Sequence, residues 1–191
     1  LVEDGNDDNE RQQDNLVLND VRQYVCESAG KRVILSNGIP DHYVINARNV
    51  PCEKFWFFEL PLDPPVPPPI NNNNNSITEI PPMIIAVAKN GVPAFGAQEG
   101  TGGNALDPNS PFAGAKFWYG HATATNIDHY HNPQMGNEEY AYTNTTSTTS
   151  TKLGENDLLG YALDGYKIYG FAEDPSTLDE CNGKIHTLIT P

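Results

Sequence analysis

The chain has 191 residues and carries 25 Asp and Glu against 11 Lys and Arg, which gives a formal net charge of −14. A surface of that sign repels phosphate backbones and anionic membranes, so the composition argues against a nucleic-acid partner. Sixteen Gly and sixteen Pro favour turns and short strands, and no stretch reaches the roughly 20 apolar residues that cross a bilayer. Because the chain begins at Leu1 instead of Met, we expect a processed piece of a longer protein.

The N-terminal part predicts a tail followed by strands. Residues 1–15 are acidic and lack periodicity, which predicts a disordered or extended tail, and residues 16–191 are expected to form one domain. Residues 16–26 fit neither the helical nor the strand period. Residues 31–36 predict a strand followed by a turn, and residues 54–60 predict a strand that is apolar on both faces and therefore central.

A Pro-rich and Asn-rich segment occupies residues 61–82. Six prolines fall within residues 61–70, and residues 71–75 are all asparagine. Such sequences favour polyproline II structure and flexible loops, and they cannot join a β-ladder. The stretches on either side hold too few core residues to fold alone, so we interpret the segment as an excursion within the one domain.

Two later segments predict β-hairpins of the same plan. Asn90-Gly91 separates residues 83–89 from 92–96, and Asp164-Gly165 separates residues 157–163 from 166–170. Both dipeptides are typical of two-residue turns in which both central residues have positive φ. Pro93 indicates an edge strand or a bulge, because proline cannot donate to a ladder. The expected fold is mainly β, a single sandwich-like domain of antiparallel strands and hairpins with long loops.

The cysteines and two sequons favour an exported protein. Cys26 and Cys52 flank one strand-and-turn unit and are predicted to form a disulfide, which leaves Cys181 as the odd cysteine. Sequons for N-glycosylation stand at Asn74 and Asn144 in polar, loop-like sequence. We therefore expect an extracellular or cell-surface location.

The candidate metal ligands gather in residues 115–131, which hold three of the five histidines. His129 and His131 are two apart, so a strand would point both imidazoles to one face, which we expect to face solvent. A loop return would bring His121 to the same point, and His42 follows a strand-to-loop junction as a further candidate. The alternative is that these imidazoles are hydrogen-bonded strand or turn residues beside aromatic side chains.

Several motifs resemble the YHYH domain family in their order along the chain. The family's naming tetrad appears here as DHYH, with Asp128 in place of the first tyrosine. The resemblance covers residues 31 to about 186 and implies export, but it implies no particular reaction. It rests on the segments SNGIPDH (36–42), KNGVPAF (89–95), GH (120–121), HYH (129–131), LLGYALDGYKIYG (158–170) and LDECNG (178–183).

Three functions compete. The first is an extracellular domain that binds copper or zinc, because imidazole ligands suit these metals and no zinc-type thiol spacing is present. The second is a metal-dependent enzyme on the same site, because three ligands leave one coordination position open for water. The third is an assembly module of a surface layer or filament, whose partners would be other copies or surface proteins and whose histidines would only pack.

Overall fold

The structure is a computed structural model, and it describes residues 18–41, 49–66, 83–98, 103–105, 120–131, 154–170, 172–179 and 182–184. These residues form two β-sheets, and their only helical segments are two single 3-10 turns, η1 (Glu27–Ala29) and η2 (Pro175–Thr177). The expected mainly β fold is confirmed. No helix in these ranges is long and apolar enough to cross a bilayer.

The first sheet is an antiparallel meander of three strands in the order β1-β2-β3, with bounds β1 (Val21–Cys26), β2 (Lys31–Ser36) and β3 (Trp56–Pro61). β1 could not be predicted from the sequence, because nearly all of its residues are exposed and no apolar alternation marks it. The central position expected for residues 54–60 is wrong, since β3 is an edge strand. Its apolar residues on both faces reflect an exposed Phe57 beside a buried Phe58.

The second sheet has six strands in the order β6-β7-β5-β4-β8-β9. Neighbouring strands are antiparallel except β5 and β7, which are parallel and are paired through a single residue pair, Ala94 with Tyr130. The strands are β4 (Ile84–Ala88), β5 (Pro93–Phe95), β6 (Gly120–Ala122), β7 (Asp128–Tyr130), β8 (Leu158–Ala162) and β9 (Lys167–Tyr169).

Both predicted hairpins form, as β4–β5 and β8–β9, but with three-residue loops. In the first, Ala88 N–H donates to Val92 O at 2.9 Å and Gly91 N–H donates to Ala88 O at 2.8 Å. The second repeats this pattern at Ala162. Only the glycines have positive φ, 83° at Gly91 and 95° at Gly165. This is a type I turn followed by a left-handed glycine, so the expected two-residue turn is wrong while the hairpin itself is right.

Pro93 does not lie on an edge strand, because β5 is placed between β4 and β7. It is the first residue of β5, a position where the missing N–H costs no ladder bond. The register irregularity of this hairpin falls in β4, between Ile84 and Ala86. The edge position expected from Pro93 is therefore wrong.

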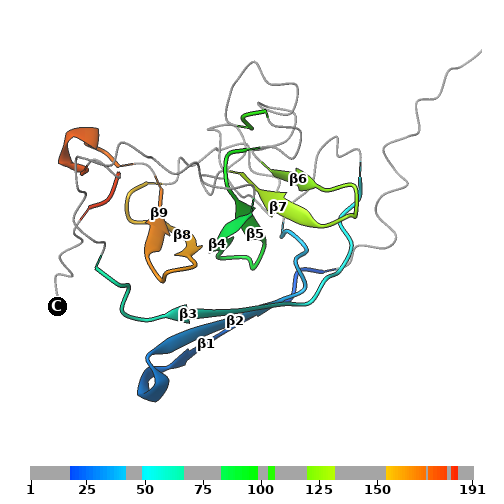
Figure 1. Ribbon diagram of the computed structural model, residues 1–191, viewed down its shortest axis with the longest axis horizontal. Helices are drawn as coiled ribbons and strands as arrows, with labels where there is room; N and C mark the ends of the chain where they lie inside the picture. Colours follow the sequence, from blue (N-terminus) through cyan, green and yellow to red (C-terminus); the bar gives the residue numbers. More distant parts are fainter. Residues whose placement is uncertain are drawn as a thin grey trace, which may run out of the picture.

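The two sheets pack face to face, with the three-stranded sheet below the six-stranded one in Figure 1. One core cluster draws Ile34, Phe58 and Leu60 from the first sheet and Val87 and Tyr161 from the second. Both hairpin turns press on the first sheet. A Cβ added at Gly91 would overlap Ser36 Oγ, and one added at Gly165 would overlap the carbonyl oxygen of Pro61. The turn glycines therefore permit this close approach.

The predicted disulfide is not formed, because Cys26 and Cys52 are both free and exposed. Cys26 pairs with Lys31 at one end of β2, whereas Cys52 precedes β3, whose first residue pairs with Ser36 at the other end. Five residues of strand, about 17 Å, separate those two ends of β2. Several other predictions lie outside the described residues: the tail at 1–15, residues 67–82 of the Pro/Asn-rich excursion, Asn74, Asn144, His42 and Cys181.

Candidate metal centre

A short β-hairpin carries the three histidines that were predicted to converge, His121, His129 and His131. β6 and β7 are antiparallel, and their register places His121 directly opposite His129. The connecting turn is closed by a bond from Thr123 N–H to Ile127 O at 2.8 Å, with Asn126 in the left-handed region at φ 59°. Asparagine tolerates this conformation better than other non-glycine residues. The turn therefore fixes the register that brings His121 to the HxH pair.

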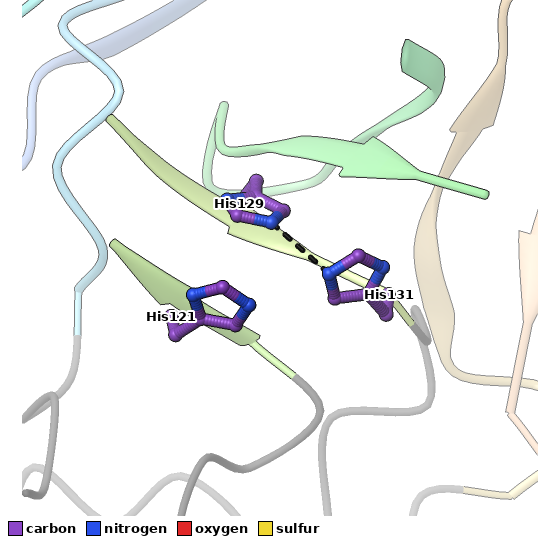
Figure 2. Close-up of side chains that lie close together, drawn as sticks. All are labelled: His121, His129 and His131. Atoms are coloured by element: carbon purple, nitrogen blue, oxygen red, sulfur yellow. Dashed lines mark hydrogen bonds between the residues drawn. The ribbon is translucent and has the colours of Figure 1, made fainter. Parts of the chain in front are cut away.

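The three imidazoles converge, as Figure 2 shows. Ring centroids are 4.5 Å apart for His121 and His129, 4.8 Å for His129 and His131, and 5.5 Å for His121 and His131. One nitrogen of each ring lies within 4.8 Å of the others. The closest pair is His129 Nε2 and His131 Nε2, at 3.1 Å. The predicted convergence is confirmed for these three residues.

Backbone carbonyls fix the orientation of each ring. The Nδ1 atom faces Ala122 O at 3.3 Å in His121, Ile127 O at 3.4 Å in His129 and Gly96 O at 2.7 Å in His131. Gly96 O can only accept, so its 2.7 Å contact places the proton of a neutral His131 on Nδ1 and leaves the lone pair on Nε2. His131 Nε2 can then accept the 3.1 Å hydrogen bond from Nε2 of His129. A metal ion in place of that proton would bind Nε2 of a ring whose Nδ1 is held by a carbonyl, as is usual for metal-binding histidines.

The HxH pair is buried, contrary to the expectation that it faces solvent. His129 is 3% exposed and His131 is 6% exposed. The ring of Phe95 covers them, with centroids 4.4 Å from His129 and 6.5 Å from His131. Burial, followed by the neighbouring His121 and His131, lowers the pKa of His129 to about 3. The imidazole of His129 is therefore neutral at neutral pH.

The opposite face of β7 carries Asp128 and Tyr130. Asp128 is 3% exposed, and no described group lies within hydrogen-bonding reach of its Oδ1. Burial raises the pKa of this carboxyl to about 7. Strand alternation turns Asp128 away from His129, in agreement with its expected exclusion from the ligand set.

Sequence reasoning missed the residues of β5 that shape the site. Phe95 and the Gly96 carbonyl contact the imidazoles only because β5 and β7 lie side by side, 35 residues apart in the chain. The periodicity of apolar residues in the sequence cannot reveal a parallel strand contact that consists of a single residue pair. The remaining candidate ligand, His42, lies outside the described residues, so the histidine group consists of His121, His129 and His131.

No protein-family model, curated protein or solved structure matches this chain. The resemblance to the YHYH family therefore rests on the sequence motifs, and the function must be argued from the histidine geometry.

Proposed function

We propose that this protein binds one copper or zinc ion through His121, His129 and His131. The observation that carries the proposal is that each of the three histidines presents a ring nitrogen to one space, and these nitrogens lie within 4.8 Å of one another. His129 Nε2 and His131 Nε2 share a hydrogen bond of 3.1 Å, so a metal ion bound between them would replace one proton. The lowered pKa of His129 keeps its imidazole neutral at neutral pH, as a metal ligand must be.

The spacing suits these metals. Metal–imidazole bonds of about 2.0–2.1 Å put tetrahedral ligand nitrogens roughly 3.3 Å apart. His129 Nε2 and His131 Nε2 are already 3.1 Å apart, so only a small inward movement of His121 is needed. Imidazole ligands without thiolates favour copper and zinc over alkaline-earth ions, which prefer oxygen. A fourth ligand, His42 or water, would complete the site.

The open fourth position keeps a metal-dependent reaction as a second candidate function. Metal centres with three protein ligands hold water or substrate at the remaining position. Such a metal would polarise that molecule and lower the pKa of a bound water. Exchange of the bound water for azide, seen as a change in the visible spectrum of cobalt-loaded protein, would support this candidate, and an inert spectrum would remove it.

We place this function outside the cell or at its surface, and we assign the chain to the YHYH family. The sequons at Asn74 and Asn144 support the location, and the family motifs support both the location and the family. Because Cys26 and Cys52 are free, a disulfide no longer supports them. Mass spectrometry of the natively produced protein should find glycan on at least one sequon, and unmodified asparagine in an intracellular fraction would contradict export.

The test of metal binding is elemental analysis of protein purified without a histidine tag, before and after dialysis against limiting copper or zinc. We expect one ion per chain. His129→Ala should abolish retention of the metal ion. His186→Ala is the matched control, because His186 is not one of the predicted ligands. If wild-type protein retains no ion after loading, metal binding fails and assembly becomes the leading function.

A further inference from the structure

The metal-site hairpin is attached to the rest of its sheet by very little backbone. β7 has three residues and is paired with β5 through Ala94 and Tyr130 alone. By contrast, β4 is paired with β8 through three residue pairs. Because the strand ladder is so short here, side chains must supply most of the contacts that set the position of β7 on β5.

Tyr130 supplies the main contact on the face opposite the histidines. It is 1% exposed and packs with Ala86, Ala88, Val92 and Ala94 in the second core cluster. Its hydroxyl accepts a hydrogen bond from Asn90 Nδ2 at 3.0 Å. A buried tyrosine joined to a polar partner fixes both the depth and the direction of the side chain. The position of Tyr130 thus depends on Asn90.

Asn90 is itself held from several sides at the tip of the β4–β5 hairpin. Its Nδ2 also donates to Asp41 Oδ1 at 2.7 Å, and its Oδ1 accepts from Val92 N–H at 3.2 Å. Its carbonyl accepts from Asn19 Nδ2 at 2.8 Å. These bonds hold Asn90 independently of Tyr130, so Asn90 is a fixed anchor for the tyrosine hydroxyl.

The orientation of the imidazoles depends on the same contact between β7 and β5. Gly96 O, directly after β5, holds Nδ1 of His131, and Phe95 covers His129. If β7 moved on β5, His131 would lose the carbonyl that fixes its tautomer. We propose that Tyr130 and Asn90 are positioning residues of the metal centre, which keep β7 on β5 so that Gly96 and Phe95 can orient the ligand rings. This inference rests on the proposed metal binding.

The experiment compares Tyr130→Phe with Tyr161→Phe. Both changes remove one hydroxyl from a buried tyrosine, but Tyr161 belongs to the other core cluster. Zinc affinity is measured by competition with a chromophoric chelator. Loss of groups that orient metal ligands typically costs 10–100-fold in affinity, so we expect about tenfold weaker binding for Tyr130→Phe and no change for Tyr161→Phe. Equal affinities in the two variants would overturn the proposal.

A metal-free measurement separates this inference from the proposed function. Long-range proton–nitrogen NMR reports which imidazole nitrogen carries the proton. In wild-type protein we expect His131 in the Nδ1–H form, and in Tyr130→Phe a mixture of both tautomers. If wild-type protein binds no zinc and this tautomer shift still appears, the metal function fails while the positioning of His131 stands. An unchanged tautomer in Tyr130→Phe refutes the positioning role.

A double-mutant cycle tests whether the two residues act together. Asn90→Ala should weaken zinc binding by at least the factor found for Tyr130→Phe, because it also removes the bonds to Asp41 and Val92. The combined variant should bind zinc no more weakly than Asn90→Ala alone. Fully multiplied losses would show that Tyr130 and Asn90 act independently and would contradict the proposed pair. Circular dichroism of each variant shows whether the β fold is retained.

Discussion

Two hairpins flank β4–β5 in the six-stranded sheet, and they are held in different ways. β8–β9 joins β4 through a three-pair antiparallel ladder, and a Cβ added at Gly160 would overlap the backbone of Val87. β6–β7 joins β5 through one parallel pair, supplemented by the side chains of Tyr130 and His131. The first hairpin is held by backbone and the second by side chains.

The two hairpins also differ in the polarity of the residues that they bury. β8 buries Leu159 and Tyr161, whereas the β6–β7 hairpin buries Asp128, His129 and His131 in addition to Ala122 and Tyr130. Burying polar groups costs free energy, and an ionisable group without a full set of partners costs more. This cost is present in the β6–β7 hairpin and absent from the β8–β9 hairpin. The difference indicates that the functional residues lie in β6–β7. Each prediction below changes one hairpin and uses the other as reference.

The largest expected effect is loss of metal binding in His129→Ala combined with His131→Ala. Two of three ligands are removed, so affinity for zinc should fall by more than about 100-fold, the scale at which even groups behind the ligands act. The reference is Leu159→Ala in β8–β9, which should lower the free energy of unfolding by about 2–4 kcal/mol through a core cavity. Isothermal titration calorimetry should find its zinc affinity unchanged; a loss there would show that any core defect abolishes binding.

Asp128→Asn should stabilise the metal-free protein at high pH. Because burial raises the pKa of Asp128 to about 7, folding opposes ionisation, and stability falls as pH rises from about 4 to 7. Above pH 7 the neutral asparagine should therefore raise the free energy of unfolding by up to about 4 kcal/mol, with almost no effect below pH 4. Urea unfolding at pH 3.5 and pH 8 measures the difference, and an equal effect at both pH values would contradict it.

Gly91→Ala and Gly165→Ala should each destabilise the fold by about 2 kcal/mol or more, because both positions combine positive φ with close contact to the first sheet. The two variants should differ in zinc affinity. Gly91 follows Asn90, so its replacement should also weaken binding, whereas Gly165 lies in the reference hairpin. Thermal unfolding and zinc competition on the same samples measure both effects, and equal zinc affinities would contradict the coupling of the β4–β5 tip to the metal hairpin.

The smallest expected effect is acid destabilisation through His129 in the metal-free protein. The pKa of His129 is lowered to about 3, so its contribution is present above about pH 6.5 and is lost as pH falls toward 3. Between pH 7 and pH 5 the loss should be about 2 kcal/mol. Asp128 titrates in an overlapping range with opposite sign, so the measurement uses Asp128→Asn. In that background, the further change His129→Gln should flatten the profile, and a persisting slope would assign it to other groups.

Local patterns in the sequence predict much of the fold. The strand segment at residues 31–36 with its following turn places β2 correctly, and the turn dipeptides place both glycine-turn hairpins. β1 escapes prediction because its side chains are exposed, and the β5–β7 contact escapes it because a single parallel pair leaves no local signal. The turn type was wrong because Asn-Gly and Asp-Gly also suit a type I turn followed by a left-handed glycine.

The metal site, like the fold, could be predicted only in part. Two-residue alternation predicts that His129 and His131 share a face, and the short return predicts the approach of His121. Their burial could not be predicted, because Phe95 covers them from a strand that the chain reaches only through tertiary packing. The predicted disulfide was wrong for a related reason. Cys26 and Cys52 bracket one strand-and-turn unit in the sequence, but the fold places them near opposite ends of β2.

X-ray absorption spectroscopy of the zinc-loaded protein tests the central claim most directly, because it counts the ligands around the ion. We predict three imidazole nitrogens at about 2.0–2.1 Å with the outer-ring scattering typical of histidine. His129→Ala should reduce that imidazole scattering, and His186→Ala should leave it unchanged. A spectrum dominated by oxygen ligands, or one that is identical in wild-type protein and His129→Ala, would contradict the assignment of His121, His129 and His131 as the metal site.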